Sequence, residues 1–373
     1  MITECRFKNF KALHDVSLPL ERLTVIVGPN SAGKSTILQG LSLLGQLAEQ
    51  SLDQVLGARL YPEDLLARGR SFPIELAAVD SQSPQHGFAV RITGWKPKED
   101  NQVARLKGDV AGDPEFQRAV QFDSWHEERV ASWCSAFRGV TFLRLDPQKL
   151  MAVSRFPETE QPRLGIDGTG FASVLGFLAG NQPDDFQSIQ GMAREVVPHL
   201  RSVRLRRRKI DVPELFDVTS MLWKSAVHWG EQVVLDFDGA ESVAAPEASE
   251  GTLLVLGLIT ALRSRPHPWL ILLDDIDRGL HPRAQRELVQ QLRKQLELNP
   301  GLQIICTTHS PFLLEHMEYA EIRLVYMGPD GGVRAAKLSD HPDYESWKDV
   351  MSPGEAWSTV AENWIDQISN RTP

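Results

Sequence analysis

Short runs of apolar residues without polar alternation lie at widely separated places along this chain. They are Leu23–Val27, Trp269–Leu273 and Leu302–Thr308. Continuous runs of this kind are typical of strands that are covered on both faces of a sheet. Leucines at helical spacing follow the first run as far as Leu47 and precede the third within Glu287–Leu298, which predicts amphipathic helices. Strands alternating with helices predict an α/β fold with a mostly parallel core sheet.

The chain before residue 150 predicts a second layer of strands. Ile74–Val79 and Phe88–Ile92 flank a turn rich in Ser, Gln, Pro and Gly, which is typical of an antiparallel hairpin. The charged stretch Asn101–Phe137 is expected to be largely helical. Val140–Leu145 is then expected to return to the core sheet as a strand.

The region from residue 168 to residue 237 predicts a helical lobe followed by strands. Apolar residues in Gly168–Leu200 have helical spacing, and Leu222–Phe237 alternates as strands do. No heptad run is long enough for a coiled-coil arm. The basic segment Arg201–Lys209 alternates so that a strand would place Arg204, Arg206 and Arg208 on one face. Such a face could bind a nucleic-acid backbone; a solvated strand face, or pairing with nearby acidic residues, is the alternative.

The tail contains a local helix signal. Ser352-Pro-Gly-Glu355 has the residues of a capping box with Pro at the first helical position. The helix is expected to run through Trp357, Val360, Trp364 and Ile365. Docking on the core is the expected role of its apolar stripe, and a partner-binding surface is the alternative.

The composition restricts the size of the core and the cellular environment of the protein more than it restricts the function. With 373 residues, 42% of them hydrophobic, the chain can bury a large core, as one long domain or two smaller ones. It has no apolar run long enough to span a membrane and no apolar leader. The three cysteines Cys5, Cys134 and Cys306 are widely spaced, which argues against disulfides and zinc and for a reducing cytoplasm. A net charge of −9 gives no overall attraction to DNA, so any contact needs a local basic patch.

A glycine-rich motif follows the first apolar run. Gly28-Pro-Asn-Ser-Ala-Gly-Lys-Ser-Thr36 fits G-x-x-x-x-G-K-[ST] between a predicted strand and a predicted helix. Backbone N–H groups of such a loop and the helix N-terminus cradle phosphate oxygens, so a nucleoside triphosphate is the expected ligand. Lys34 would reach the β- and γ-phosphates, and the Ser35 hydroxyl could hold Mg²⁺. The candidate nucleotide-binding residues are Asn30, Ser31, Ala32, Gly33, Lys34, Ser35 and Thr36.

Two further strands end in polar residues that would face the same crevice. Asp274 and Asp275 follow Trp269–Leu273, and His309 follows Leu302–Thr308. Asp274 would hold Mg²⁺ through water, and Asp275 would orient or deprotonate the attacking water. His309 could hydrogen-bond the γ-phosphate or that water, which makes Asp275 and His309 the candidate catalytic residues.

Several motifs together carry a family resemblance. Besides the glycine-rich motif they are Ile2–Leu13, Ser249-Glu-Gly-Thr252, Asp274–Pro282 and Thr308–Pro311. With these motifs the chain resembles an ATP-binding-cassette (ABC) ATPase of the soluble branch that includes SMC, RecF-type and OLD (overcoming-lysogenization-defect) proteins. They correspond to the first strand, signature, Walker B with D-loop, and switch-histidine turn of that branch. The Gly-Leu-His-Pro282 D-loop and the Ser-Glu-Gly-Thr252 signature resemble those of its OLD-like members and of related small ATPases.

The resemblance implies an ABC-type P-loop fold with an antiparallel β layer, an inserted helical lobe, and ATP and Mg²⁺ as ligands. It implies one head over residues 1–373. Its expected parts are a P-loop core with the β layer (1–150), a helical lobe with returning strands (151–248), the signature, Walker B and switch histidine (249–315), and a C-terminal strand and helix (316–373). Gln148, after the strand predicted at Val140–Leu145, could be the glutamine that touches Mg²⁺ in this family; a surface glutamine is the alternative.

The resemblance also implies a homodimer that sandwiches ATP, in which Ser249, Glu250 and Gly251 would contact the nucleotide of the partner copy. Two departures from the family pattern matter. Ala248 and Glu250 replace the first Leu and the first Gly of the usual Leu-Ser-Gly-Gly-Gln. Asp275 stands where the family usually has Glu, and a carboxylate that is about 1 Å out of place can cost roughly 10²-fold in rate. We therefore expect slow hydrolysis.

Three functions compete at this stage. The first is an ATP-dependent switch that dimerises and controls a separate effector, a nuclease or toxin, in anti-phage defence or DNA maintenance. The second is a RecF-like ATPase that binds DNA ends or DNA structures through the arginine strand. A transporter ATPase is disfavoured because the D-loop reads Gly279-Leu-His-Pro282. Only about 60 residues follow His309, so we expect no C-terminal Toprim nuclease domain of the larger OLD proteins and no cutting by this chain alone.

Overall fold

The computed structural model describes residues 1–50, 55, 62–71, 73–80, 83–92, 139–155, 161–217, 222–264, 267–360 and 364–369. The chain divides into two compact units. Unit 1 comprises Met1–Phe142, Trp269–Ile276 and Gln295–Pro373, and unit 2 comprises Leu143–Pro268 and Asp277–Lys294. The helix expected over Asn101–Phe137 and the cysteine Cys134 lie outside the described residues.

The centre of unit 1 is a six-stranded sheet in the order β14-β13-β3-β12-β11-β6. Its strands are β3 (Leu23–Val27), β6 (Val140–Leu143), β11 (Leu270–Leu273), β12 (Gln303–Thr307), β13 (Ile322–Met327) and β14 (Val333–Lys337). β11, β12, β3 and β13 pair in parallel, and β14 is antiparallel to β13. All residues of β3, β11 and β12 are buried, so the mostly parallel core sheet predicted from the apolar runs is confirmed.

A second, four-stranded sheet of unit 1 is antiparallel, with the order β2-β1-β4-β5. Its strands are β1 (Ile2–Phe10), β2 (Leu13–Pro19), β4 (Ile74–Asp80) and β5 (Ser83–Ile92), and a 3-10 turn, η1 (Pro62–Leu65), precedes β4. The predicted hairpin and antiparallel layer are therefore confirmed. Helix α1 (Lys34–Leu47) packs on this layer, where a β-carbon at Gly40 would lie 2.5 Å from the ring of Phe7. Both sheets and α1 contribute to one hydrophobic core.

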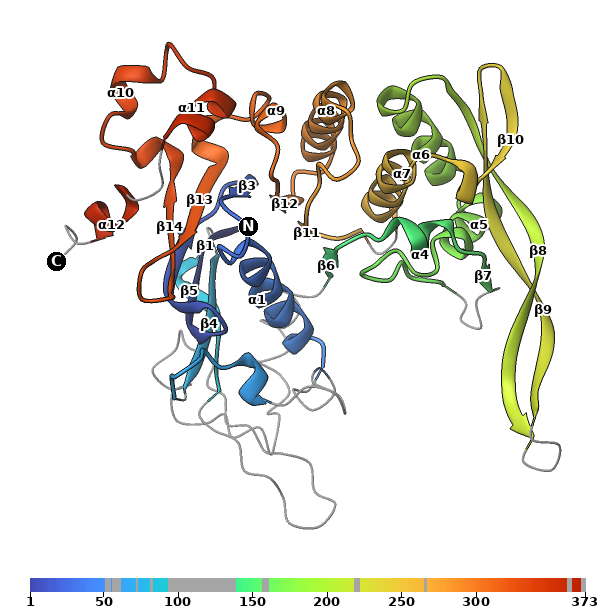
Figure 1. Cartoon of the computed structure of the whole chain (residues 1–373), viewed down its shortest axis with the longest axis horizontal. Coiled ribbons are helices and arrows are strands. Elements are labelled where there is room, and N and C mark those ends of the chain that lie inside the picture. Colours follow the sequence, from blue (N-terminus) through green and yellow to red (C-terminus); the bar gives the residue numbers. More distant parts are fainter. Residues whose placement is uncertain are drawn as a thin grey trace. The chain divides into compact units, whose positions relative to one another are not determined.

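Unit 2 contains helices and a sheet with a long hairpin (Figure 1). The helices are α4 (Pro147–Met151), α5 (Phe171–Asn181), α6 (Pro183–Val196), α7 (Glu250–Arg263) and α8 (Pro282–Leu298), whose last residues belong to unit 1. The strands are β7 (Ser154–Arg155), β8 (Leu200–Asp217), β9 (Leu222–Phe237) and β10 (Ala240–Ala244), with a 3-10 turn, η3 (Ala245–Glu247), after them. β8 and β9 pair antiparallel and extend well beyond β7 and β10. The predicted helical lobe and returning strands are confirmed. Helix α8 starts at Pro282 and not at the predicted Glu287. The leucine pattern missed this first turn because the turn is polar and lacks the leucine repeat.

The C-terminal part of unit 1 is built from short helices and 3-10 turns around β13 and β14. They are α9 (Pro311–Leu314), η4 (Tyr319–Glu321), η5 (Leu338–Asp340), α10 (Tyr344–Trp347), α11 (Pro353–Thr359) and α12 (Trp364–Ser369). The predicted capping box is confirmed, because the Glu355 N–H donates to Ser352 Oγ and the Ser352 N–H donates to Glu355 Oε2. The single helix predicted through Ile365 is wrong, since α11 ends at Thr359 and Val360 is extended (φ −86°, ψ 124°). The Thr359 hydroxyl donates back to the Glu355 carbonyl, and β-branched Thr and Val are poor helix formers, so the sequence favours an end here.

Two of the four residues of the expected apolar stripe in the tail are buried, while Trp357 and Val360 are half-buried. Trp364 and Ile365 of α12 are 4% and 1% exposed, in agreement with the expected docking of the tail. Cys5 and Cys306 are buried and are not joined in a disulfide. Among the described residues, no helix has the length and apolar character needed to cross a bilayer.

Candidate nucleotide-binding site

The glycine-rich loop follows β3 in a conformation that depends on its two glycines. Gly28 has φ +153°, and a β-carbon there would lie 1.9 Å from the carbonyl oxygen of Val325 on the neighbouring strand β13. Gly33 has φ +94° and precedes the first residue of α1. Side chains other than hydrogen are strained in this region of backbone space, so the loop turns here because glycine permits it. The exposed Asn30 and Ser31 lie at the bend, and Ser31 also has a positive φ of 63°.

Lys34 stands at the N-terminus of α1 with its ammonium group held inside the loop. Its side chain is 6% exposed, and Nζ donates to the carbonyl oxygens of Gly28 at 2.8 Å and Pro29 at 2.9 Å. A buried cation next to the N-terminal N–H groups of a helix makes this loop attractive to anions. Ala32 is buried, and Thr36 follows in the first turn of α1.

Asp274, the residue after β11, joins the loop to the strand ends. Its Oδ1 accepts hydrogen bonds from the Ser35 hydroxyl at 3.0 Å and from the Thr307 hydroxyl at 2.7 Å. The register Leu273↔Cys306 between β11 and β12 places Asp274 beside Thr307. The Asp274 side chain is mostly buried, with 7% exposure.

This donor set fits Mg²⁺. A carboxylate and hydroxyl oxygens are the hard ligands that this ion takes, and Mg²⁺ usually keeps waters and binds substrate phosphates besides one or two carboxylates. Within the described residues, no group of three or more His, Cys, Asp or Glu side chains lies together. The Asp274–Ser35 pair therefore fits an ion that arrives with a nucleotide better than one held by the protein alone.

Thr307 is a site residue that the sequence analysis missed. It is fully buried, and its hydroxyl accepts the N–H of Asp275 at 2.8 Å while donating to Asp274. Its carbonyl accepts the N–H of Ile276 at 3.1 Å. A threonine at the end of a buried strand, two residues before His309, was the available signal. Thr307 thus holds both residues that follow Asp274.

Asp275 itself has a positive φ of 55°, which is uncommon for a residue with a side chain. Such conformations persist where the surroundings enforce them, and they gather at functional sites. Here the hydrogen bond to Thr307 enforces the conformation, and the side chain is half-buried. The His309 side chain, beyond the end of β12, is exposed. Unit 1 therefore brings together the predicted Lys34, Ser35, Asp274 and Asp275 at strand ends that also carry His309.

The signature residues belong to unit 2, at the start of α7. Ser249 caps this helix, because its Oγ accepts the Thr252 N–H at 3.2 Å and lies 2.7 Å from the Thr252 hydroxyl. Ser249 and Glu250 are exposed. Gly251 is buried against the D-loop, where its β-carbon would lie 2.4 Å from the carbonyl oxygen of Gly279. Signature and D-loop thus touch through two glycines within unit 2.

Gln148 also belongs to unit 2, while Asp274 belongs to unit 1. Its side chain is exposed on the first turn of α4, and its backbone N–H donates to Asp146 Oδ1 at 2.9 Å. This bond is a helix N-cap. The role of Gln148 at Mg²⁺ stays a prediction.

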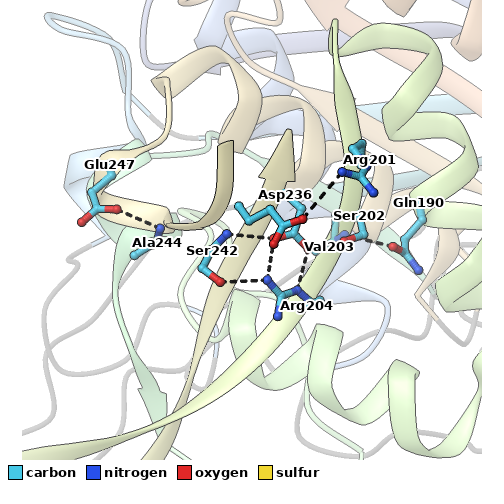
Figure 2. Close-up of polar contacts among 10 residues, drawn as sticks. Gln190, Arg201, Ser202, Val203, Arg204, Asp236, Ser242, Ala244 and Glu247 are labelled. Atoms are coloured by element: carbon cyan, nitrogen blue, oxygen red, sulfur yellow. Dashed lines mark hydrogen bonds and ion pairs between the residues drawn. The ribbon is translucent and has the colours of Figure 1, made fainter. Parts of the chain in front are cut away.

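The predicted basic face lies on β8, and its arginines differ in their partners; Figure 2 shows those of Arg204. Arg204 donates to both carboxylate oxygens of Asp236, at 2.6 and 2.5 Å, and to Ser242 Oγ at 3.0 Å. Hydrogen bonds from Arg204, then from Ser202 and the Ser242 backbone, hold the pKa of Asp236 well below its usual range. The charge of Arg204 is therefore compensated.

The other two arginines of that face have a neutral partner. Arg206 Nη2 and Arg208 Nε each lie 3.1 Å from the side-chain oxygen of Gln232, to which they donate. Both side chains are exposed. In the contacts described, Arg206 and Arg208 therefore have no hydrogen bond to a carboxylate. Arg204 has one, so its charge no longer counts toward the predicted basic patch.

Comparisons with protein families agree with the architecture. Residues 1–83 match the AAA ATPase domain family, and residues 139–315 match an AAA domain family whose description names the AbiEii toxin and the Type IV TA system. The chain is 25% identical over 371 residues to the OLD nuclease of Thermus scotoductus. That alignment covers 89% of this chain and 63% of the relative, so the chain spans less than two thirds of that protein.

Solved structures support the fold. An SMC head bound to the C-terminal winged-helix domain of ScpA has a TM-score of 0.53 at 16% identity, over 91% of this chain and 99% of the other. An SMC head with an extended coiled coil, bound to the C-terminal domain of ScpA derived from Pyrococcus furiosus, has a TM-score of 0.55 at 12% identity. That match covers 94% of this chain and 99% of the other. At these identities the likeness concerns the fold, which is that of a P-loop ATPase.

Proposed function

Because the chain is an ABC-type ATPase head of the branch that includes SMC heads and OLD nucleases, we propose that it is a Mg²⁺-dependent ATP switch. The observation that carries this proposal is the contact of Asp274 with Ser35 and Thr307, which joins the glycine-rich loop to two strand ends. A carboxylate, two hydroxyls and a buried ammonium at one helix N-terminus match the needs of a metal-bound triphosphate.

Each residue has a separate role in this proposal. When bound, ATP would supply the γ-phosphoryl group, and Mg²⁺ would neutralise its charge. Lys34 exchanges its hydrogen bonds with the loop carbonyls for bonds to phosphate oxygens. Ser35 and Asp274 would hold the metal, Asp275 would orient the attacking water and accept its proton, and His309 would donate a hydrogen bond at the γ-phosphate.

We propose that hydrolysis is slow. Asp275 is one methylene shorter than the Glu usual in the family, and its backbone is held in place by Thr307, so its reach to the water is fixed. A displacement of about 1 Å can cost roughly 10²-fold in rate. A long-lived ATP state suits a switch.

The test of the ATP site is Lys34→Ala, with the half-buried Lys348 as the matched control. Lys34→Ala is expected to abolish tight ATP binding and hydrolysis while the fold survives, because no second cation in the loop's described hydrogen bonds replaces it. Lys348→Ala removes an ammonium that pairs with exposed Glu345 and lies 5.8 Å from the ring centroid of Tyr344, and this variant should bind and hydrolyse ATP as wild type does. Wild-type turnover by Lys34→Ala would refute the assignment of the site.

We also propose that ATP joins two copies of the chain. The signature residues Ser249–Gly251 and the glycine-rich loop belong to different units, and in ABC heads these motifs meet across a two-fold interface. Sedimentation with a non-hydrolysable ATP analogue should then detect a dimer that Ser249→Arg prevents. A mass that does not depend on nucleotide, or a dimer that Ser249→Arg leaves unchanged, would refute the proposed ATP-bound dimer.

A separate effector chain, a nuclease or toxin, is the proposed target of this switch in anti-phage defence or DNA maintenance. The OLD nuclease relative is longer than this chain, and the matched AAA family description names a toxin. Two buried cysteines outside any disulfide suit a reducing cytoplasm. Co-purification with the product of a neighbouring gene, with and without ATP, tests the proposal.

Binding of DNA is the second candidate function, and Arg206 and Arg208 favour it. Both are exposed and bonded only to neutral Gln232 in the contacts described. Replacing both with Ala should weaken DNA binding and lower the salt slope by about 2. Arg286→Ala, on an exposed arginine that is paired with Glu287, is the control. Equal salt slopes for all three proteins would exclude this face.

A further inference from the structure

Helix α9 contacts the start of α11 immediately beyond the switch-histidine turn. The Ser352 hydroxyl donates to Glu315 Oε1 at 2.8 Å, and Glu355 Oε2 lies farther from it, at 3.1 Å. A β-carbon at Gly354 would lie 2.3 Å from the carbonyl oxygen of Pro311 and 2.4 Å from Glu315 Oε1. The two helices therefore meet through backbone as well as through a side-chain hydrogen bond.

The path from this contact back to Asp274 is short, and its residues are mostly buried, with His309 the exposed exception among residues 307–310. Thr307, which bonds Asp274 Oδ1, is the last residue of β12, and Thr308 after it is fully buried. The hydroxyl of Thr308 accepts the N–H of Ser310 at 3.0 Å, and α9 begins at the next residue. The carbonyl of Ser310 accepts the N–H of Leu313 at 3.2 Å, and Leu313 is fully buried. Only residues 308–310 therefore separate α9 from Thr307, the hydrogen-bond partner of Asp274.

The segment that contains α10 and α11 has a second anchor. The Tyr319 hydroxyl donates to the Met351 carbonyl at 2.6 Å. The Tyr319 ring packs on Tyr344 and Trp347, with centroids 5.4 and 5.6 Å away. Tyr319 belongs to η4, which leads into β13 of the core sheet. This anchor is fixed to the sheet, whereas the contact at Glu315 and Gly354 depends on the position of α9.

We propose that the α9–α11 contact transmits the nucleotide state of the candidate site to the C-terminal segment. The inference rests on the proposed binding of ATP at Lys34 and Asp274. A small displacement of the turn at His309 moves α9, because α9 follows it directly, and this opens or tightens a contact made of one hydrogen bond and one close glycine. Glu315 and Gly354 are positioning residues that couple α11 to the turn.

Amide hydrogen exchange of Pro353–Thr359 in the full chain tests the coupling. With Mg²⁺ and ATPγS, exchange in wild type is expected to change by at least about fivefold, the lower end of ordinary coupling between sites. Glu315→Ala removes the hydrogen bond to Ser352 and should abolish this response. Glu355→Ala is the matched control, because it breaks the capping box of α11 but not the contact with α9. It should raise exchange with and without nucleotide and keep the ratio.

Binding of ATPγS is titrated on the same proteins, which separates two kinds of failure. Binding without any change in the exchange of α11 overturns the coupling and leaves the ATP site standing. No binding by wild type overturns both. Gly354→Ala provides a second disruption at the backbone contact; a response of wild-type size in both Gly354→Ala and Glu315→Ala also overturns the coupling.

Discussion

Replacing Thr307 with Val removes one hydroxyl from the candidate site and keeps the β-branched shape of the side chain. In the structure this hydroxyl donates to Asp274 Oδ1 at 2.7 Å and accepts the N–H of Asp275 at 2.8 Å. The substitution therefore takes a donor from a mostly buried carboxylate and an acceptor from the backbone of a residue with positive φ.

The expected loss follows from these two bonds. A hydrogen bond to a charged group contributes about 1.5–3 kcal/mol, and an unsatisfied buried donor costs about 1–3 kcal/mol. Because the two terms share one hydroxyl and are not additive, we expect a loss of about 3 kcal/mol in the free energy of unfolding of unit 1. For a domain of this size each kcal/mol lowers Tm by about 2–4 °C, so the expected shift is about 6–12 °C.

The same change should slow hydrolysis more than it weakens ATP binding. Lys34 and the loop backbone are untouched, but Asp275 loses the bond that holds it, and a displacement of about 1 Å can cost roughly 10²-fold. Scanning calorimetry measures the change in Tm, and single-turnover hydrolysis measures the change in rate. Thr260→Val is the control: Thr260 is equally buried, but its hydroxyl bonds only the Leu256 carbonyl of its own helix. If Thr307→Val melts like this control and hydrolyses ATP at the wild-type rate, the role assigned to Thr307 is wrong.

Three further predictions concern other parts of the chain. Asp275→Asn should keep ATP binding but lower single-turnover hydrolysis strongly, and an unchanged rate would move the general base elsewhere. Gly28→Ala should abolish binding of a fluorescent ATP analogue in a folded protein, because its β-carbon would meet the Val325 carbonyl at 1.9 Å; normal affinity would refute the close approach. Arg204 lowers the pKa of Asp236, so this carboxylate stabilises the hairpin above its unfolded pKa of about 3.9 and loses that effect as pH falls through the lower folded value. The destabilisation caused by Asp236→Asn should therefore shrink below about pH 4 in thermal melts, and a pH-independent difference would contradict the ion pair.

The sequence predicted those features whose causes are local. The apolar runs of β3, β11 and β12 are buried whatever surrounds them, and the capping box at Ser352 depends on four consecutive residues. The two loop glycines were recognised from the sequence motif. The motif has glycine at both positions because the backbone there has a positive φ, as Gly28 and Gly33 show. Local signals failed at Thr359, where back-bonding to the preceding turn ended a helix that the apolar stripe alone would have continued.

Features that depend on pairing between distant strands could not be predicted. Thr307 became a site residue only because the register of β11 and β12 places it beside Asp274. Likewise, the carbonyl of Val325 lies behind Gly28 because β13 pairs with β3. The contact between Gly251 and Gly279 joins two motifs whose sequences give no sign of their proximity. In each case the composition of the contacting segment was clear from the sequence, and its alignment with the other segment was not.

Thr307 holds a candidate catalytic residue and also the start of the segment that leads into unit 2. Its hydroxyl holds the N–H of Asp275 and its carbonyl holds the N–H of Ile276, the last residue of this segment of unit 1. The next residues enter unit 2 and form the D-loop, whose Gly279 touches the signature residue Gly251. A backbone change at Asp275 therefore acts on the candidate catalytic carboxylate and on the start of the D-loop together. Because Gly279 and Gly251 approach each other closely within unit 2, a displacement that reaches the D-loop also reaches the signature segment.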